Sequence, residues 1–327
     1  MKKLRGRSGL VVIFIALSLF VYPPSKAWAR SGCFWITAGE IFVPGLGYGV
    51  SGQFDKMLLF GGGRWLAANQ YANTSASPDY QQNPNEIYKT TSAKDSDSGK
   101  VETRVYLTQA TYEARYYAYL ESNLTLISWG DLYQHSCDAN TETYKWVAAP
   151  FLFNQFYDNW MFWVPMAVLA SNAATFNDTQ LVEYHLSRGL TQSRMRRDEF
   201  GHFYMVGLGE EMLFRGTFQH YFYETMNDSW GWGKEPSRHM SVVAASAVFG
   251  AAHTGMGFSA DTASAFLMGL YLGYSYMPGP DEFDLTTAIA IHAWWDIVLS
   301  YTIMNNAHFT EENPTLEVPI FAIGFKY

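Results

Sequence analysis

The stretch that decides the fold is residues 200–226, which read FGHFYMVGLGEEMLFRGTFQHYFYETM. This apolar and aromatic run has the length of a long helix, and Glu210, Glu211 and Arg215 bring charge into its middle. Glu211 and Arg215 are four residues apart and share one helix face, whereas Glu210 lies about 100° around the helix. Glu211 can therefore be neutralised by Arg215, which leaves Glu210 as a desolvated carboxylate suited to be a general base. A solvated helix face is the alternative for a single short motif of this kind.

The composition favours a membrane setting. Of the 327 residues, 48% are hydrophobic and 17% aromatic, while only 16% are charged, against roughly 25% in ordinary soluble domains. The mean hydropathy of -0.11 is low for a polytopic membrane protein, so we expect a substantial polar part beside any spanning bundle. The net charge of -8 argues against nucleic acid as a partner, because phosphate binding needs a basic surface.

The first 29 residues are typical of an export signal. A basic start precedes an apolar core from Leu10 to Val21 and a small-x-small cleavage site at Ala27-Trp28-Ala29. About twelve apolar residues are too few to span a bilayer roughly 30 Å thick, although an uncleaved first anchor is the alternative. Export would place Cys33 and Cys137 in an oxidising compartment, where the two could form a disulfide.

Residues 30–145 are predicted to be an exported N-terminal region of unassigned purpose. The glycines and apolar residues at 40–66 predict a Gly-rich apolar hairpin. The polar residues at 71–100 predict an exposed loop. Tyr, Leu and Ala at helical spacing predict an amphipathic surface helix at 103–129.

The composition changes near Trp146, where a membrane domain is predicted to begin and to run to residue 305, followed by a tail at 306–327. Five apolar segments are predicted to span the membrane: 150–170, 201–223, 240–257, 262–277 and 285–304. Four arginines between the first two segments predict a cytoplasmic loop there. The expected fold class is all-α: a polytopic membrane helical bundle with a polar, partly helical N-terminal exported region.

Two further motifs lie on these predicted helices. Phe249 and His253 are four residues apart, and so are His292 and Asp296, so each pair shares one helix face. Taken singly, His253 is more often a satisfied core histidine, and His292 with Asp296 a hydrogen-bonded pair. Three apolar helices that each bring ionisable groups to one face indicate a functional interior instead.

The three motifs together resemble, in order and spacing, one known family, the CPBP intramembrane proteases, which include CAAX prenyl endopeptidases and bacteriocin-processing proteins. The motifs that carry the resemblance are Glu210-Glu211-x-x-x-Arg215, Phe249-x-x-x-His253 and His292-x-x-x-Asp296. The resemblance covers roughly residues 145–305 and implies an α-helical bundle with a conical cavity where peptide bonds are cut.

The same resemblance implies a role for each motif residue. Glu210 with His253 would activate a water, and His292 with Asp296 would stand where the family stabilises the oxyanion. The predicted structural residues are Glu211, Arg215 and Phe249.

Asp296 departs from the Asn found in some members. A charged Asp would repel an oxyanion unless it were protonated or instead oriented His292, and both roles stay open. His253, His292 and one carboxylate, from Glu210 or Asp296, could also hold zinc with an open position, so zinc is a candidate cofactor.

The sequence thus predicts an intramembrane endopeptidase that hydrolyses a membrane-associated or exported peptide or protein. Its expected partners are that substrate and the lipid bilayer, and its expected location is a membrane, the bacterial inner membrane, with the N-terminal region exported. A catalytically silent scaffold or immunity factor is the leading alternative. A transporter that uses the buried charges as a proton relay, and a soluble aromatic-rich domain, are the others.

Overall fold

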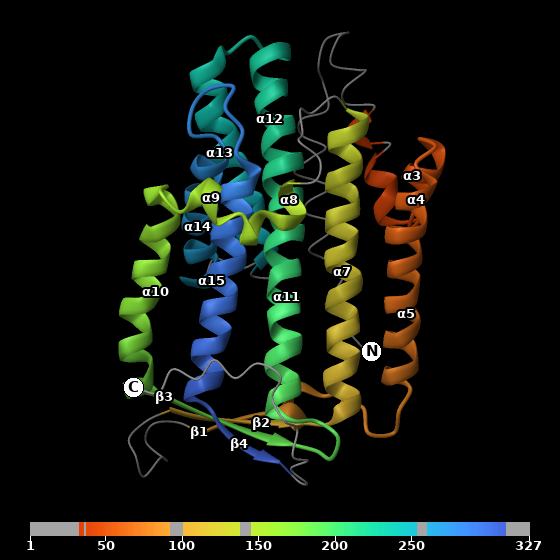
Figure 1. Cartoon of the computed structure of the whole chain (residues 1–327), viewed down its shortest axis with the longest axis vertical. Coiled ribbons are helices and arrows are strands. Elements are labelled where there is room, and N and C mark those ends of the chain that lie inside the picture. The colour runs from red at the N-terminus through yellow and green to blue at the C-terminus, as the bar shows by residue number, and fades with distance from the viewer. Residues whose placement is uncertain (1–32, 36, 92–100, 138–144, 254–259, 312–327) are drawn as a thin grey trace, which may run out of the picture. The chain divides into compact units, whose positions relative to one another are not determined.

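The computed structural model describes residues 33–35, 37–91, 101–137, 145–253 and 260–311. Most of this part of the chain is helical, as predicted (Figure 1). The predicted export signal at 1–29 lies outside the described residues.

The N-terminal region contains short helices and two longer ones. They are η1 (Gly39–Ile41), α3 (Leu46–Val50), α4 (Phe54–Lys56), η2 (Met57–Gly61), α5 (Gly62–Ser75), α6 (Pro84–Ile87) and α7 (Gln109–Ser136).

The rest of the chain contributes the helices that carry the three motifs. They are α8 (Lys145–Ala148), η3 (Ala149–Phe151), α9 (Phe153–Phe156), α10 (Trp160–Thr179), α11 (Gln192–Leu213), η4 (Phe214–Gln219), α12 (His220–Glu224), η5 (Thr225–Ser229), α13 (Lys234–His253), α14 (Ala260–Tyr276) and α15 (Leu285–Asn306).

A four-stranded sheet was not predicted. β1 (Tyr88–Thr91) pairs antiparallel with β2 (Val101–Leu107), which pairs parallel with β3 (Gln180–Leu186), which pairs parallel with β4 (His308–Glu311). Val105 and Leu107 of β2 are buried in the period of two that a strand requires. The predicted amphipathic helix was therefore placed too early, and α7 begins only at Gln109.

Two other predicted boundaries also differ. The segment 71–100 is not a plain loop, because α5 continues to Ser75 and α6 and β1 lie inside it. The predicted span 150–170 is broken into η3, α9 and α10, and α10 begins only at Trp160. Asn159 caps that helix, since its side-chain Oδ1 accepts a hydrogen bond from the Met161 amide at 3.0 Å.

None of the helices within the described ranges combines the length with the apolar content needed to cross a bilayer. The predicted polytopic bundle is therefore not confirmed. The other four predicted segments do coincide with helices, namely α11 with η4 and α12, then α13, α14 and α15.

The chain divides into two compact units. One comprises residues 1–64, 122–163 and 206–293, and the other comprises 65–121, 164–205 and 294–327. The sheet lies in the second unit, where Ile87, Leu107, Leu186 and Met304 belong to one buried cluster. The first unit carries the motif residues from Glu210 to His292, so the site is described within it.

The core of the first unit is aromatic. Phe34, Trp129, Tyr133, Phe218 and Phe249 belong to one buried cluster, which joins the N-terminal region to the motif-bearing helices. The disulfide predicted between Cys33 and Cys137 is present beside this cluster. Residues far outside the resemblance therefore build the core on which the candidate site rests.

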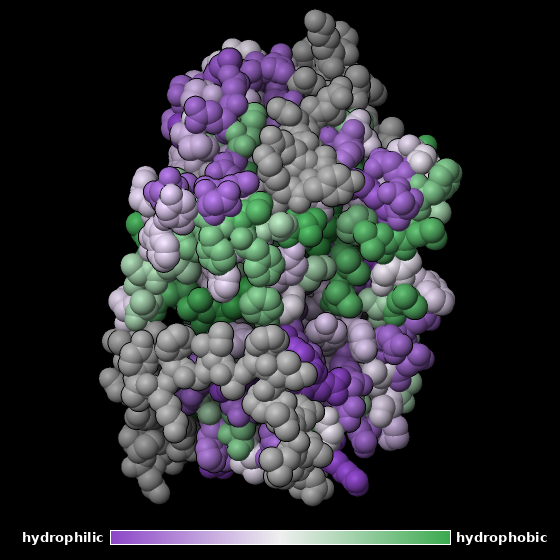
Figure 2. All heavy atoms as spheres, viewed as in Figure 1, coloured by the Kyte–Doolittle hydropathy of each residue, from purple (hydrophilic) through white to green (hydrophobic). Residues whose placement is uncertain are grey.

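Apolar side chains also gather on the surface of the first unit, over α8, α9 and the start of α10 (Figure 2). Phe151 and Phe153 are each 50% exposed, and Trp160 is 67% exposed. Large aromatic groups in such a patch indicate a surface that contacts something apolar.

Candidate active site

The first motif begins where α11 changes into a π-helix. Glu210 and Glu211 lie in the last turn of α11, and Arg215 is the second residue of the π-helical turn η4. Within that turn the Thr217 hydroxyl donates to the Met212 carbonyl five residues back, at 3.0 Å. π-Helical turns inside longer helices occur frequently at functional sites, because they re-aim side chains.

Glu210 faces both predicted histidines. His253 Nε2 lies 3.3 Å from Glu210 Oε2, and His292 Nε2 lies 3.8 Å from the same oxygen. These residues come from α11, α13 and α15, so the structure brings together the three motifs that the sequence placed on separate helices. Glu210 keeps 19% of its side chain exposed and His253 keeps 36%, while the Oε2 atom of Glu210 itself is buried.

The ring orientation of His253 follows from its second contact. His253 Nδ1 lies 2.9 Å from the carbonyl oxygen of Phe249, and a carbonyl only accepts, so Nδ1 carries the hydrogen. In neutral His253, Nε2 then presents a lone pair toward the Glu210 carboxylate. Two acceptors at 3.3 Å require a shared proton between them. The geometry therefore creates a position for one mobile proton beside Glu210.

Glu211 is fully buried and divides its two oxygens between two partners. His292 Nδ1 lies 2.7 Å from Oε1, and Arg215 Nε lies 3.1 Å from Oε2. The ion pair with Arg215 is the one that the spacing of four residues predicts. The contact with His292, which comes from a helix 81 residues further along the chain, is a finding that the sequence did not indicate.

Phe249 lies at the centre of these groups. Its ring centroid is 4.2 Å from that of His253 and 5.9 Å from that of His292. The Arg215 guanidinium lies over the Phe249 ring, 4.7 Å from its centroid, in cation–π geometry. The Phe249 ring therefore contacts Arg215 and both histidines, and it helps to fix their positions.

Two glycines let the helices approach, and sequence reasoning missed both. A Cβ at Gly207 would lie 2.5 Å from the Ala293 backbone nitrogen, so α11 and α15 touch beside His292. A Cβ at Gly130 would lie 2.8 Å from Met212 Cβ, so α7 touches α11 beside Glu211. Gly207 could have been noticed from its position three residues before Glu210. The sequence around Gly130, on α7, gave no indication of a close contact.

Asp296 lies one turn after His292 on α15, in the part of that helix assigned to the second unit. The Nδ1 atom, where an orienting carboxylate would bind His292, already has Glu211 as its partner at 2.7 Å. The role predicted for Asp296 stays a prediction.

The candidate zinc site gains no support from the geometry. Within the described ranges, no group of three His, Cys, Asp or Glu side chains has the arrangement of a metal site.

Helices α11, α13 and α15 thus bring two glutamates and two histidines into one site, which is the residue set expected of the predicted endopeptidase class. Residues 200–298 match the family model described as Rce1-like, type II CAAX prenyl endopeptidase Rce1-like. No curated protein and no solved structure matches the chain. The match is consistent with the CPBP family, so the predicted resemblance is confirmed for this segment. The Rce1-like family comprises membrane-associated, CAAX protease-like endopeptidases.

Proposed function

We propose that the protein is a membrane endopeptidase that cuts peptide bonds with a water activated by Glu210 and His253. The observation that carries the proposal is the 3.3 Å contact between Glu210 Oε2 and His253 Nε2, which joins two partly exposed side chains. A carboxylate and an imidazole that compete for one proton can take a proton from water and return it later.

The reaction then proceeds in two steps. A water beside Glu210 and His253 attacks the carbonyl carbon of the peptide bond while its proton passes to Glu210, and a tetrahedral oxyanion forms. The C–N bond then breaks, and the stored proton passes to the leaving nitrogen. The products are a new carboxyl terminus and a new amino terminus, with one water consumed.

His292 is the group we assign to the oxyanion. Its Nδ1 atom contacts Glu211, which leaves Nε2 on the side of Glu210, with 3.8 Å between Nε2 and Glu210 Oε2. When Nε2 carries a proton it can donate to the developing negative charge, and the Glu211 carboxylate, which accepts at Nδ1, orients the ring for that donation. Asp296, one turn further on, is proposed to assist as stabiliser or as orienting group.

The membrane arrangement is part of the same proposal. We infer a polytopic helical bundle with the N-terminal region exported, as the low charge and the family's membrane association suggest. The exposed aromatic patch over α8, α9 and α10 supports it, because Trp and Tyr concentrate where proteins meet lipid headgroups. Release of the protein from membranes by alkaline carbonate would contradict this arrangement. The proposed substrate is a peptide or protein in that membrane.

The testing experiment compares cells that make the wild type with cells that make Glu210→Gln, at equal protein abundance, by mapping new protein termini. Gln keeps the shape of the side chain and removes the base. Glu235→Gln is the matched control, because Glu235 is 56% exposed on α13, where it lies 3.4 Å from Arg238 and 3.7 Å from His239. Termini present with the wild type and the control but absent with Glu210→Gln support the peptidase.

The result that would overturn the proposal is a set of identical terminus maps in all three strains. If Glu210→Gln then still supported the cell's phenotype, the function would be that of a catalytically silent scaffold or immunity factor.

A further inference from the structure

The segment around Phe34 lies outside the matched region 200–298, yet it is buried against that region. Phe34 has no exposed surface, and its ring stacks on Tyr221 of α12 with 4.5 Å between centroids. The same ring lies 5.6 Å from Trp129 of α7 and 6.1 Å from Phe218 of η4. One side chain from the N-terminal region thus packs between two helices of the core.

From Phe34 the aromatic contacts continue to the candidate site. Phe218 lies 5.9 Å from Phe214, and Phe214 lies 5.0 Å from Phe249 in edge geometry. Phe249 is the ring that contacts both His253 and His292. Because closely packed interiors have little free volume, loss of Phe34 would let this row of rings shift.

Helix α7 supports the glutamates from the other side. Besides the close approach of Gly130 to Met212, a Cβ at Gly209 would lie 3.1 Å from the Asn123 carbonyl oxygen. The backbones of α7 and α11 therefore touch on both sides of Glu210 and Glu211. The position of α7 fixes the position of the first motif.

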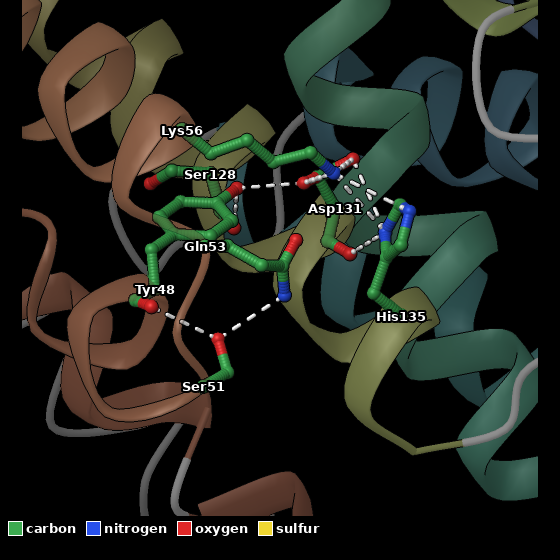
Figure 3. Close-up of polar contacts among 7 residues, drawn as sticks. All are labelled: Tyr48, Ser51, Gln53, Lys56, Ser128, Asp131 and His135. Atoms are coloured by element: carbon green, nitrogen blue, oxygen red, sulfur yellow. Dashed lines mark hydrogen bonds and ion pairs between the residues drawn. The ribbon is translucent and has the colours of Figure 1, made fainter.

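Two kinds of interaction hold the N-terminal segment against α7. One is polar: Lys56 Nζ lies 2.8 Å from Asp131 Oδ2, and the Tyr48 hydroxyl donates to the same oxygen at 2.8 Å (Figure 3). The other is the covalent link between Cys33 and Cys137, which lies next to Phe34 in sequence and at the end of α7 in space. Cys33 is partly exposed, so a reductant in solution can reach the link.

We propose that the Cys33–Cys137 disulfide and Phe34 hold the candidate site in its cleaving arrangement, so that only the oxidised protein is active. The activity part of this inference rests on the proposed peptidase function. Oxidation joins the two thiol sulfurs and passes two electrons and two protons to a disulfide donor, whose own disulfide becomes two thiols. Reduction by a dithiol reverses the exchange, frees Cys33 from Cys137, and removes the covalent link next to Phe34.

The test uses the full-length protein in detergent micelles in four forms: wild type, wild type treated with dithiothreitol that is then removed, Cys33→Ser/Cys137→Ser, and Phe34→Ala with the disulfide intact. Diethylpyrocarbonate, which acylates accessible imidazole nitrogens, is the probe, and mass spectrometry measures the rate at each histidine. His292 has 7% of its side chain exposed in the site, and His220 has 6% exposed away from it. These two similarly buried residues allow local and global loosening to be separated.

The expected result, well below the unfolding temperature, is that acylation of His292 speeds up at least fivefold in the reduced, double-serine and Phe34→Ala forms. His220 should stay within twofold of the wild type. Unchanged His292 acylation, or an equal rise at both histidines, would overturn the proposal. Dithiothreitol should not alter the double-serine variant, which controls for effects of the reagent itself.

Cleavage at the termini that depend on Glu210 is the second readout. We expect a loss of at least tenfold in the reduced and double-serine forms. Full cleavage by the double-serine variant would refute the proposal and leave the peptidase function standing. If the wild type cleaved nothing, the peptidase function would fail, and the His292-to-His220 comparison would still decide whether the disulfide positions the site.

Discussion

Glu211 Oε1 accepts a hydrogen bond from His292 Nδ1 at 2.7 Å, and both side chains are buried. The two adjacent glutamates of the motif therefore have different surroundings. Glu210 keeps 19% of its side chain exposed and faces the Nε2 atoms of two histidines, whereas Glu211 is enclosed between His292 and Arg215. Glu211 is thus better described as the residue that orients His292 than as half of an isolated ion pair.

The first prediction concerns Glu211→Gln. The amide can still contact His292 but is a weaker and less directional acceptor for its Nδ1 hydrogen, so we expect cleavage to fall by about 10- to 100-fold, the range found when a partner that orients a functional imidazole is replaced. Initial rates at equal protein concentration measure the effect. Glu235→Gln, the same substitution at an exposed position, should leave the rate unchanged.

A second substitution, at Arg215, allows the effect of Glu211→Gln on catalysis to be separated from its effect on folding. Glu211→Gln leaves the buried guanidinium without its carboxylate, which costs about 3–5 kcal/mol of unfolding free energy. Adding Arg215→Met removes the unpaired charge, so the double variant should regain much of the stability but none of the activity. Recovery of cleavage together with stability would show that Glu211 acts only through the fold.

The motif helices could be predicted from sequence because their signals are local. A spacing of four residues predicts the Glu211–Arg215 contact, and apolar runs predicted helices at 240–257, 262–277 and 285–304. The Glu211–His292 contact and the sheet could not be predicted. The Glu211–His292 contact joins α11 to α15, and the sheet depends on the pairing of β2 with β3. These partners are more than 70 residues apart along the chain, and the spacing of apolar residues within one segment does not indicate which distant segment it contacts.

The second prediction concerns Gly207, which sets the distance between α11 and α15. A Cβ there would lie 2.5 Å from the Ala293 nitrogen, which is backbone and cannot rotate away, so Gly207→Ala must push the helices apart. We expect cleavage to fall at least tenfold, because Glu211 and His292 lie on these two helices. Gly201→Ala is the matched control on α11, since a Cβ there meets nothing within 4 Å. It should keep full activity and stabilise the helix by about 0.5–1 kcal/mol.

The third prediction concerns pH and the surface pair of Glu113 and Arg194. Burial raises the pKa of Glu113, but hydrogen bonds from Gln109 and Arg194 and the charge of Arg194 outweigh it, and the pKa falls below 4.5. A carboxyl whose pKa is lower in the folded state contributes stability above its unfolded pKa and loses it as pH falls through the folded value.

Glu113→Gln should therefore lower the unfolding free energy by about 0.5–1 kcal/mol at pH 7, since the 2.7 Å contact with Arg194 is only partly buried. The difference from the wild type should shrink below about pH 4.5. Denaturant unfolding at pH 7 and pH 3.5 measures it. A difference that stayed constant or grew on acidification would contradict the assignment.

The last prediction concerns Asp296, the residue that departs from the Asn of some relatives. A charged carboxylate there would repel an oxyanion, whereas an amide N–H would stabilise it. Orienting His292 is the other role open to Asp296, but Glu211 already occupies Nδ1 of that ring. We therefore expect Asp296→Asn, which brings an N–H donor, to keep the cleavage rate within about threefold of the wild type or to raise it, and to cleave about 10-fold or more faster than Asp296→Ala, which brings none. If the Asn variant were as slow as the Ala variant, the negative charge of Asp296 would be required, and its role would be to orient or to hold a proton.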